Sequence, residues 1–207
     1  MQTKETMMSV KPFAITLDVG TSLANRTGSW RTLKPVYVDR LPPCNAKCPA
    51  GEQCQAWLFH AQSGNYENAW KQIIEDNPFP AVMGRVCYHT CQGACNRNGI
   101  DEPVGINAVE RFLGDYALEK GWQLPVPAAD TGKRILIVGA GPAGLSAAYQ
   151  LRRLGHAVHV VESAEAAGGM MRYGIPKYRL PREVLDQEIA RITALGVEFE
   201  FGREVKD

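Results

Sequence analysis

The sequence predicts a mixed fold, in which an α-helical domain that carries all the cysteines precedes the first half of a Rossmann-like α/β domain. Two observations support this prediction. All six cysteines lie between residues 44 and 95, in a region where apolar side chains recur at helical spacing. After residue 132 the pattern changes to apolar strands that alternate with amphipathic helices, which is typical of a doubly wound parallel sheet.

The composition excludes several classes of protein. The chain has 207 residues and a net charge of +1, so it lacks the basic surface of a nucleic-acid or membrane-surface binder. No apolar run approaches the roughly 20 residues of a membrane span, and the N-terminus lacks the apolar stretch of a secretory signal. We therefore expect a cytoplasmic protein. A reducing cytosol disfavours disulfides and leaves clustered cysteines as ligands, redox centres or core residues.

The helical part is expected to contain two long amphipathic helices. YENAWKQIIEDN (66–77) ends before a proline, and INAVERFLGDYALEKGW (106–122) carries apolar residues at i, i+3 and i+4. The change of pattern along the chain predicts four segments: an irregular arm at 1–43, a helical domain at 44–122, a proline-rich linker at 123–132 and an incomplete α/β domain at 133–207.

The α/β segment carries a glycine motif between its first strand, RILIVG, and the helix that begins at Pro142. Gly139 permits a tight turn, Gly141 lets the backbone approach a pyrophosphate, and Gly144 lets helix and strand pack closely. Glu162 ends the next strand, AVHVVES, where it can accept hydrogen bonds from ribose hydroxyls. Because an acidic residue there disfavours a 2′-phosphate, the motif predicts FAD or NAD rather than NADP.

The second cysteine group consists of Cys87, Cys91 and Cys95. In one continuous helix, Cys87 and Cys95 would lie about 12 Å apart along the axis, at 1.5 Å per residue. That separation is too large for both to reach one cluster comfortably. Either the segment is coiled, or these three cysteines divide between two sites.

The first cysteine group consists of Cys44, Cys48 and Cys54, and Pro49 follows Cys48 directly. A Cys-Pro pair that ends a cysteine series is typical of iron–sulfur ligation. Zinc ribbons favour C-x2-C spacing, whereas every neighbouring pair here is spaced C-x3-C or wider. We therefore favour an iron–sulfur site over a zinc site or inert thiols.

Several segments resemble one family of oxidoreductases. The run MMRYGIPKYRLP, after Gly168-Gly169, resembles the flavin-domain signature of the glutamate synthase small subunit, of dihydropyrimidine dehydrogenase and of related NAD(P)H-dependent enzymes. CNAKCP, NPFPAVMGRVCYHTCQGAC and PVGINAVERF resemble the helical domain of the same family, which holds two [4Fe–4S] clusters. The resemblance implies FAD at the glycine motif, in contact with Gly139, Gly141, Gly144, Glu162, Gly169, Met170 and Arg179.

The resemblance also implies a set of cluster ligands. One [4Fe–4S] cluster would be bound by Cys48, Cys87, Cys91 and Glu110. The family's other cluster would use Cys44 and Cys95, but its two remaining cysteine positions fall on Val36 and Asp39. The sequence therefore leaves two alternatives for these cysteines. In one, a second cluster takes Cys54 as a third ligand and Asp39 or another chain as the fourth. In the other, Cys44, Cys54 and Cys95 are core thiols.

Together these features predict an electron-transfer subunit of an NAD(P)H-dependent oxidoreductase. Electrons would pass between NAD(P)H, FAD, the cluster and a partner subunit in a hetero-oligomer, and no side chain is assigned as a catalytic acid or base. The family continues into an NAD(P)H domain and then completes the FAD domain, so we expect the 207-residue chain alone to be inactive. The alternative is a non-enzymatic assembly module with a structural metal site that docks a larger partner.

Overall fold

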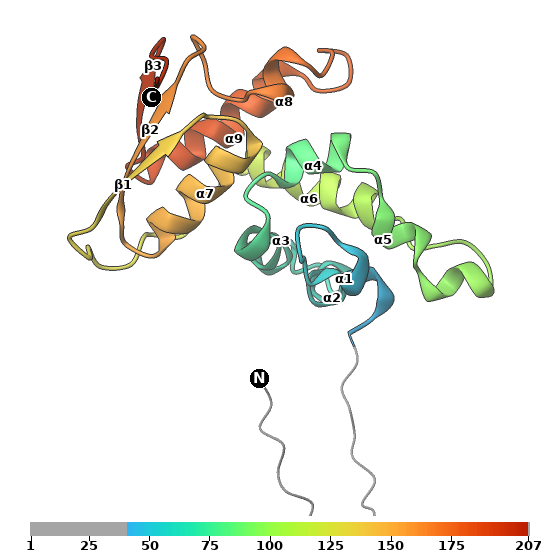
Figure 1. The fold of residues 1–207 in the computed structure, drawn as a ribbon. Helices are drawn as coiled ribbons and strands as arrows, with labels where there is room; N and C mark the ends of the chain where they lie inside the picture. The colour runs from blue at the N-terminus through green and yellow to red at the C-terminus, as the bar shows by residue number, and fades with distance from the viewer. Residues whose placement is uncertain (1–40, 207) are drawn as a thin grey trace, which may run out of the picture. The chain divides into compact units, whose positions relative to one another are not determined.

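The computed structural model describes residues 41–206, so nearly all of the predicted arm, including Val36 and Asp39, lies outside the described residues. The helical part comes first and the α/β part second (Figure 1). The helical part contains α1 (Pro43–Lys47), α2 (Cys54–Gln62), α3 (Tyr66–Asp76), α4 (Pro80–Val86), α5 (Thr90–Gly93), a 3₁₀ turn (Asn96–Gly99) and α6 (Ile106–Glu119). The α/β part contains β1 (Arg134–Val138), α7 (Pro142–Arg153), β2 (Ala157–Glu162), α8 (Met170–Tyr173), α9 (Arg182–Ala194) and β3 (Glu198–Phe201).

Helices α4 and α6 approach each other closely because each has a glycine at the contact. A Cβ atom on Gly84 would lie 2.8 Å from the backbone nitrogen of Arg111, and one on Gly114 would lie 2.6 Å from Cα of Ala81. Real Cβ atoms do not approach other atoms that closely, so no larger residue fits either position without a shift of one helix. This contact fixes the position of α4, which ends at Val86, directly before Cys87.

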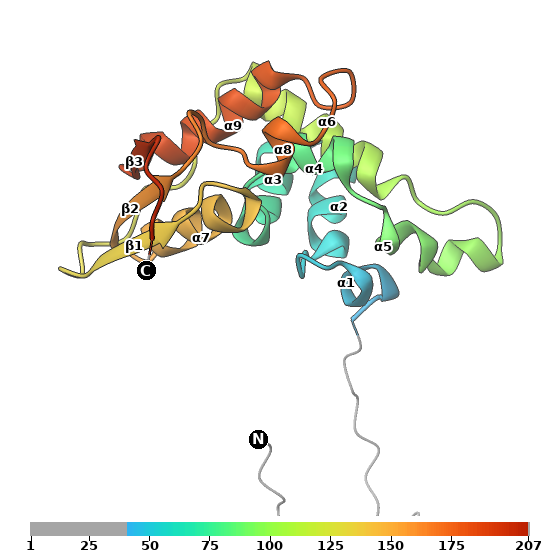
Figure 2. The same cartoon turned by 45° about the horizontal axis from the view of Figure 1, so that its top comes forward.

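The α/β part is a three-stranded parallel sheet in the order β1-β2-β3. Leu136 pairs with His159, and Val160 pairs with Phe199. Right-handed crossovers that progress in one direction place α7 and α9 on the same side of the sheet, as Figures 1 and 2 show. The predicted mixed fold, with a helical region followed by a Rossmann-like half-domain, is confirmed.

The helical and α/β parts share one hydrophobic core. Trp70 and Val82 from the helical part pack in the same cluster as Leu145, Tyr149 and Leu185 from the α/β part. Residues 123–132 form no helix or strand, as predicted for a linker, although Leu124 is buried in the shared core. The domain boundaries at this linker stay a prediction. No helix in residues 41–206 combines the length and the apolar character that a membrane crossing requires.

Side chains of the α/β part also satisfy the free backbone groups at two helix ends of the helical part. At the C-terminal end of α3, Tyr149 donates its hydroxyl proton to the carbonyl of Ile74 at 2.7 Å, and Arg153 donates to the carbonyl of Glu75 at 2.8 Å. At the N-terminal end of α4, the Glu188 carboxylate accepts hydrogen bonds from the backbone N–H groups of residues 81 and 82, at 3.0 and 3.1 Å. Carboxylates favour helix N-termini and cations favour C-termini, so both contacts follow the helix dipoles.

Candidate metal and nucleotide sites

Four cysteines and two carboxylates line one cavity of about 270 Å³ in the helical part. These side chains belong to Cys48, Glu52, Cys54, Cys87, Cys91 and Glu110. The remaining wall is mostly apolar and includes Met83 and Val86. Since one water molecule occupies about 30 Å³ of liquid, the cavity has room for a polyatomic group.

The chain brings these cysteines together by breaking its helices beside them. Cys48 follows the end of α1, and the Thr90 hydroxyl donates to the carbonyl of Lys47 at 2.9 Å, which holds α5 against that end. Cys87 follows α4 in an extended conformation. His89 then adopts the left-handed region, with φ of 58°, and turns the chain so that α5 places Cys91 in the cavity.

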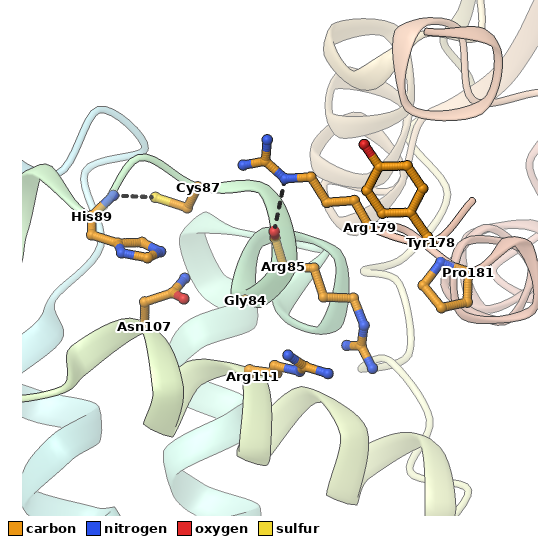
Figure 3. Close-up of a pocket in the computed structure, with 9 residues that line it drawn as sticks. All are labelled: Gly84, Arg85, Cys87, His89, Asn107, Arg111, Tyr178, Arg179 and Pro181. Carbon is orange, nitrogen blue, oxygen red and sulfur yellow. Dashed lines mark hydrogen bonds between the residues drawn. The ribbon is translucent and has the colours of Figure 1, made fainter. Parts of the chain in front are cut away.

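The segment that contains Cys87, Cys91 and Cys95 is therefore not one helix, and the separation of about 12 Å along a single axis does not arise. Left-handed backbone is uncommon for residues other than glycine and is often found at functional sites. The backbone N–H of His89 donates to Sγ of Cys87 at 3.4 Å (Figure 3). Hydrogen bonds of this kind tune the potential of a cluster that the sulfur ligates.

The thiols in the cavity influence one another's ionisation. Hydrogen bonding from Cys54 lowers the pKa of Cys48 to about 6 and that of Cys91 to about 7. The same interactions, together with burial, raise the pKa of Cys54. Burial raises the pKa of Cys87. Because the thiolate is the form that binds metal, the lowered values make Cys48 and Cys91 suitable ligands near neutral pH.

Two buried carboxylates share one amide at the cavity wall. Glu52 is 5% exposed and Glu110 is 6% exposed. The side-chain nitrogen of Asn77 donates to Oε1 of Glu52 at 2.8 Å and to Oε1 of Glu110 at 3.0 Å. Burial raises the pKa of Glu110 to about 10, with repulsion from Glu52 as a further cause. Burial raises the pKa of Glu52 to about 7, with repulsion from Cys48 as a further cause.

The structure groups the cysteines differently from the sequence-based hypothesis in one respect. The sequence-based hypothesis groups Cys54 with Cys44 and Cys95, whereas the structure places Cys54 in the cavity wall with Cys48 and Cys91. The start of α2 turns its side chain into the core, where it is 2% exposed. Cys44 and Cys95 do not line the cavity, and burial raises the pKa of Cys44.

The ligands predicted from the resemblance, Cys48, Cys87, Cys91 and Glu110, all line this cavity. The cavity surrounds a wider space than one ion fills. Within residues 41–206, no group of three His, Cys, Asp or Glu side chains is placed to hold a single metal ion. Sequence reasoning missed Glu52 and Asn77, whose signal was weak. Glu52 is a polar residue between two cysteines, and Asn77 is the last residue of a predicted helix, directly before a proline.

At the nucleotide site, the glycine motif forms a tight turn at the end of β1. Gly139 has φ of 98°, which other residues rarely adopt, and its N–H donates to the carbonyl of Val161 at 2.7 Å. A Cβ atom on Gly144 would collide with the carbonyl group of Gly139, so the third glycine permits close packing of α7 on this turn. These are the conformations that the sequence motif predicts.

The second glycine pair packs directly on the first turn. The N–H of Gly168 donates to the carbonyl of Ala140 at 2.8 Å, and Gly169 has φ of 48°. A Cβ atom on Gly169 would lie 2.8 Å from Cα of Gly141. The two glycine segments therefore meet as bare backbone, beside the N-terminus of α7, and leave N–H groups for a phosphate.

Glu162, Met170 and Arg179 occupy different positions around this turn. The Glu162 carboxylate accepts from the N–H of Ala164 at 2.9 Å and also from Ala140, and these bonds lower its pKa. Met170 follows Gly169 at the start of α8, with an exposed side chain. Arg179 lies away from the glycine turn, where its Nε donates to the carbonyl of Arg85 at 3.5 Å (Figure 3).

Arg179 lines a second cavity, of about 450 Å³, together with Cys87, His89, Arg111 and Tyr178 (Figure 3). Cys87 is thus part of the wall of both this cavity and the cysteine-lined cavity. Residues predicted to contact a flavin and residues predicted to bind a cluster therefore meet at one place.

Comparisons with known proteins identify the family. Residues 38–122 match the family model described as dihydropyrimidine dehydrogenase domain II, 4Fe–4S cluster, and residues 137–189 match the NAD(P)-binding Rossmann-like domain. The NAD-dependent dihydropyrimidine dehydrogenase subunit PreT of Salmonella typhimurium is 40% identical over 165 residues, and the glutamate synthase [NADPH] small chain of Bacillus subtilis is 37% identical over 159. The chain belongs to the glutamate synthase small-subunit and dihydropyrimidine dehydrogenase family.

As a member of the glutamate synthase small-subunit family, the chain carries an iron–sulfur domain followed by a dinucleotide-binding domain. The NADP(+)-dependent formate dehydrogenase subunit beta of Moorella thermoacetica is also similar, with 39% identity over 178 residues. These three matches cover 75% to 79% of the chain but only 25% to 40% of the relatives' own lengths. These relatives are oxidoreductase subunits.

Proposed function

We propose that this chain is the electron-input part of an NAD(P)H-dependent oxidoreductase that delivers electrons to a partner subunit. The observation that carries the proposal is the single cavity that collects Cys48, Cys87, Cys91 and Glu110. These four residues would hold a [4Fe–4S] cluster, and Cys54 is the rival for the fourth position because it lies among the same thiols. We also propose the division of the chain at residues 123–132 into a helical cluster domain and an FAD domain.

The donor set fits an iron–sulfur cluster. Thiolates are the standard ligands of such clusters, and the pKa values of Cys48 and Cys91 are lowered towards the thiolate form. Apolar side chains such as Met83 and Val86 exclude water from the cavity wall, which is one of the factors that set a cluster potential. Cys44 and Cys95 remain candidates for a second cluster, with Asp39 or another chain as a further ligand.

The bare backbone formed by Gly139, Gly141, Gly144 and Gly169 fits FAD. The N-terminus of α7 would bind the pyrophosphate, and Glu162 would accept from the ribose. Met170 and Arg179 would lie along the flavin, as in the family. FAD bound there would supply the conversion between a two-electron hydride donor and single-electron transfer. The chain's own residues bind and orient, and we assign none as an acid or base.

The contacts between the helical and α/β parts support this proposal. Glu188 and Tyr149 join the two parts through hydrogen bonds at helix ends, and both side chains are fully buried. A buried junction of this kind would hold a flavin and a cluster at a fixed separation. NAD(P)H binding, the partner subunit and a cytoplasmic location belong to the same proposal.

The experiment is to purify the 207-residue chain anaerobically and to measure iron, acid-labile sulfide, zinc and flavin per chain. We expect about four iron atoms per cluster and no stoichiometric zinc. Flavin without iron would overturn the proposal. Stoichiometric zinc without iron would favour the alternative of an assembly module with a structural metal site.

A pair of variants on α6 tests the oxygen ligand. Glu110→Ala should reduce the iron content, whereas Glu119→Ala, which removes an exposed carboxylate from the same helix, should leave it unchanged. Full iron content in Glu110→Ala, with loss in Cys54→Ser, would show that Cys54 supplies the fourth ligand instead.

A further inference from the structure

Asn77 connects the two carboxylates of the cysteine-lined cavity and is itself 4% exposed. Its Nδ2 donates one hydrogen bond to Glu52 and one to Glu110, at 2.8 and 3.0 Å. A side-chain amide nitrogen carries two hydrogens, so these two bonds use its whole donor capacity. Both bonds go to the Oε1 atom of the carboxylate concerned.

The orientation of this amide is fixed by its other end. Oδ1 of Asn77 accepts a hydrogen bond from the backbone N–H of Phe79 at 2.9 Å. A flipped amide would direct its nitrogen at that N–H group and its oxygen at two carboxylates, so each of three hydrogen bonds would become a repulsion. The observed orientation is therefore the one that satisfies every partner.

The backbone of Asn77 is also anchored. Asn77 follows the last residue of α3, and its N–H donates to the carbonyl of Ile73 at 2.9 Å. Pro78 and Pro80 follow closely and restrict the backbone before α4. The amide thus projects from a rigid connection between two helices, whereas Glu110 projects from α6 and Glu52 from the segment before α2.

We infer that Asn77 is a positioning residue: its amide fixes the Glu110 carboxylate for iron ligation and holds the Glu52 carboxylate in a separate position. This inference rests on the proposed function. Two carboxylates in one cavity would otherwise compete for the same iron atom. A side chain of this size that donates to both carboxylates and also accepts from a backbone N–H must be an amide. Aspartate has no donor for the carboxylates, and leucine can form none of the three hydrogen bonds.

The magnitude follows from the general behaviour of residues that hold metal ligands in place. Loss of such a hydrogen-bonding partner typically lowers metal affinity about 10- to 100-fold. We expect an effect of this size on the retention of the cluster, together with a change in its spectrum, because the oxygen ligand would lose its fixed orientation.

The test uses Asn77→Asp in the full 207-residue chain, purified anaerobically. Aspartate has nearly the same shape and keeps the acceptor for Phe79, but it cannot donate to both carboxylates. We expect a changed electron paramagnetic resonance (EPR) spectrum of the dithionite-reduced cluster, and iron loss to a chelator that is at least about 10-fold faster than in the wild type. Circular dichroism checks folding, and Asn77→Ser takes the place of Asn77→Asp if that variant does not fold.

The matched control is Asn107→Ala. Asn107 is a second buried asparagine, 8% exposed, whose side chain donates to the carbonyl of Met83 at 3.2 Å and not to a carboxylate. It should lose stability yet keep the wild-type EPR spectrum. The double variant Asn77→Asp with Glu110→Gln exchanges donor and acceptor: the new glutamine donates to the new aspartate across the same hydrogen bond. It should retain iron better than Asn77→Asp alone.

The outcomes separate the inference from the proposed function. A wild-type chain without iron would overturn the proposed function. A wild-type chain with a cluster, together with Asn77→Asp that has the same EPR spectrum and the same rate of iron loss, would overturn the positioning role alone. Equal spectral changes in Asn77→Asp and Asn107→Ala would do the same, because they would show a general loss of packing.

Discussion

Replacement of Glu188 by alanine tests how the α/β part stabilises the helical part. The Glu188 side chain is fully buried on α9, and its two oxygens accept hydrogen bonds from the N–H groups of Ala81 and Val82 in the first turn of α4. Both of these residues are themselves fully buried. Alanine would leave two donors without a partner and without access to water.

The expected loss follows from these two donors. A buried backbone N–H that loses its partner costs about 1–3 kcal/mol, so Glu188→Ala should lower the free energy of unfolding by about 2–6 kcal/mol. Arg191, which lies beside Glu188 and stacks over the Trp70 ring, would also lose its neighbouring carboxylate. Glu188→Gln keeps one acceptor oxygen and should cost about half as much. Domains are stable by about 5–15 kcal/mol, so the alanine variant would lose a large fraction.

The assay is urea unfolding followed by circular dichroism, with Glu183→Ala as the control. Glu183 is an exposed glutamate on the same helix, in its first turn, and its loss should cost less than about 1 kcal/mol. A Glu188→Ala chain no less stable than Glu183→Ala would refute the argument that this carboxylate caps α4.

The same residue predicts a pH dependence. Burial raises the pKa of Glu188 to about 8 in the folded protein, against the opposing effect of the two N–H donors and Arg191, whereas the unfolded value is about 4.5. Between these two values the folded state binds more protons than the unfolded state, so stability falls as pH rises. The upper limit of this loss is about 5 kcal/mol, at 1.36 kcal/mol for each pH unit. Between pH 6 and pH 8.5, wild type should therefore lose stability relative to Glu188→Gln; a constant difference would contradict this.

Three further substitutions test the packing of both parts. Gly114→Ala should destabilise the chain by about 1–3 kcal/mol in thermal unfolding, because its Cβ atom would lie 2.6 Å from Cα of Ala81. The control is Gly105→Ala, whose Cβ atom would meet no atom closer than 3.8 Å and which should leave the stability unchanged. Gly144→Ala should reduce flavin retention, measured by fluorescence after release, because the glycine turn cannot accept a Cβ atom there; unchanged retention would place the flavin elsewhere. Tyr149→Phe removes the 2.7 Å hydrogen bond to the carbonyl of Ile74 in the last turn of α3. It should lower the free energy of unfolding in urea by about 1–3 kcal/mol. A decrease below about 0.5 kcal/mol would mean that water replaces the hydroxyl.

The features that local sequence determines were predictable. The periodicity of 66–77 and 106–122 predicts helices that the structure places at Tyr66–Asp76 and Ile106–Glu119. The second helix ends early because Gly121, with φ of 67°, cannot continue it favourably. The glycine turn follows from residue type and spacing alone, since glycine is required wherever φ is positive or a backbone approaches closely.

The features that depend on long-range packing were harder to predict. The position of Cys54 depends on how α2 packs, which its sequence separation from Cys91 does not reveal. Glu188 did carry a signal: it lies three residues after Leu185 and four before Ile192, on the apolar face of its helix. A carboxylate on that face needs a buried partner, and that partner, the N-terminus of α4, is more than 100 residues away in the sequence.

The division of the cysteines is the central claim, and the iron content of two serine variants tests it most directly. Cys91 lines the cavity with Cys48 and Cys87, whereas Cys95 does not. In anaerobically purified chains, Cys91→Ser should lose the cluster signal in EPR, together with about four iron atoms, while Cys95→Ser keeps them. If Cys95→Ser instead abolishes the one cluster that the chain holds, and Cys91→Ser retains it, the assignment of the cysteine-lined cavity is wrong.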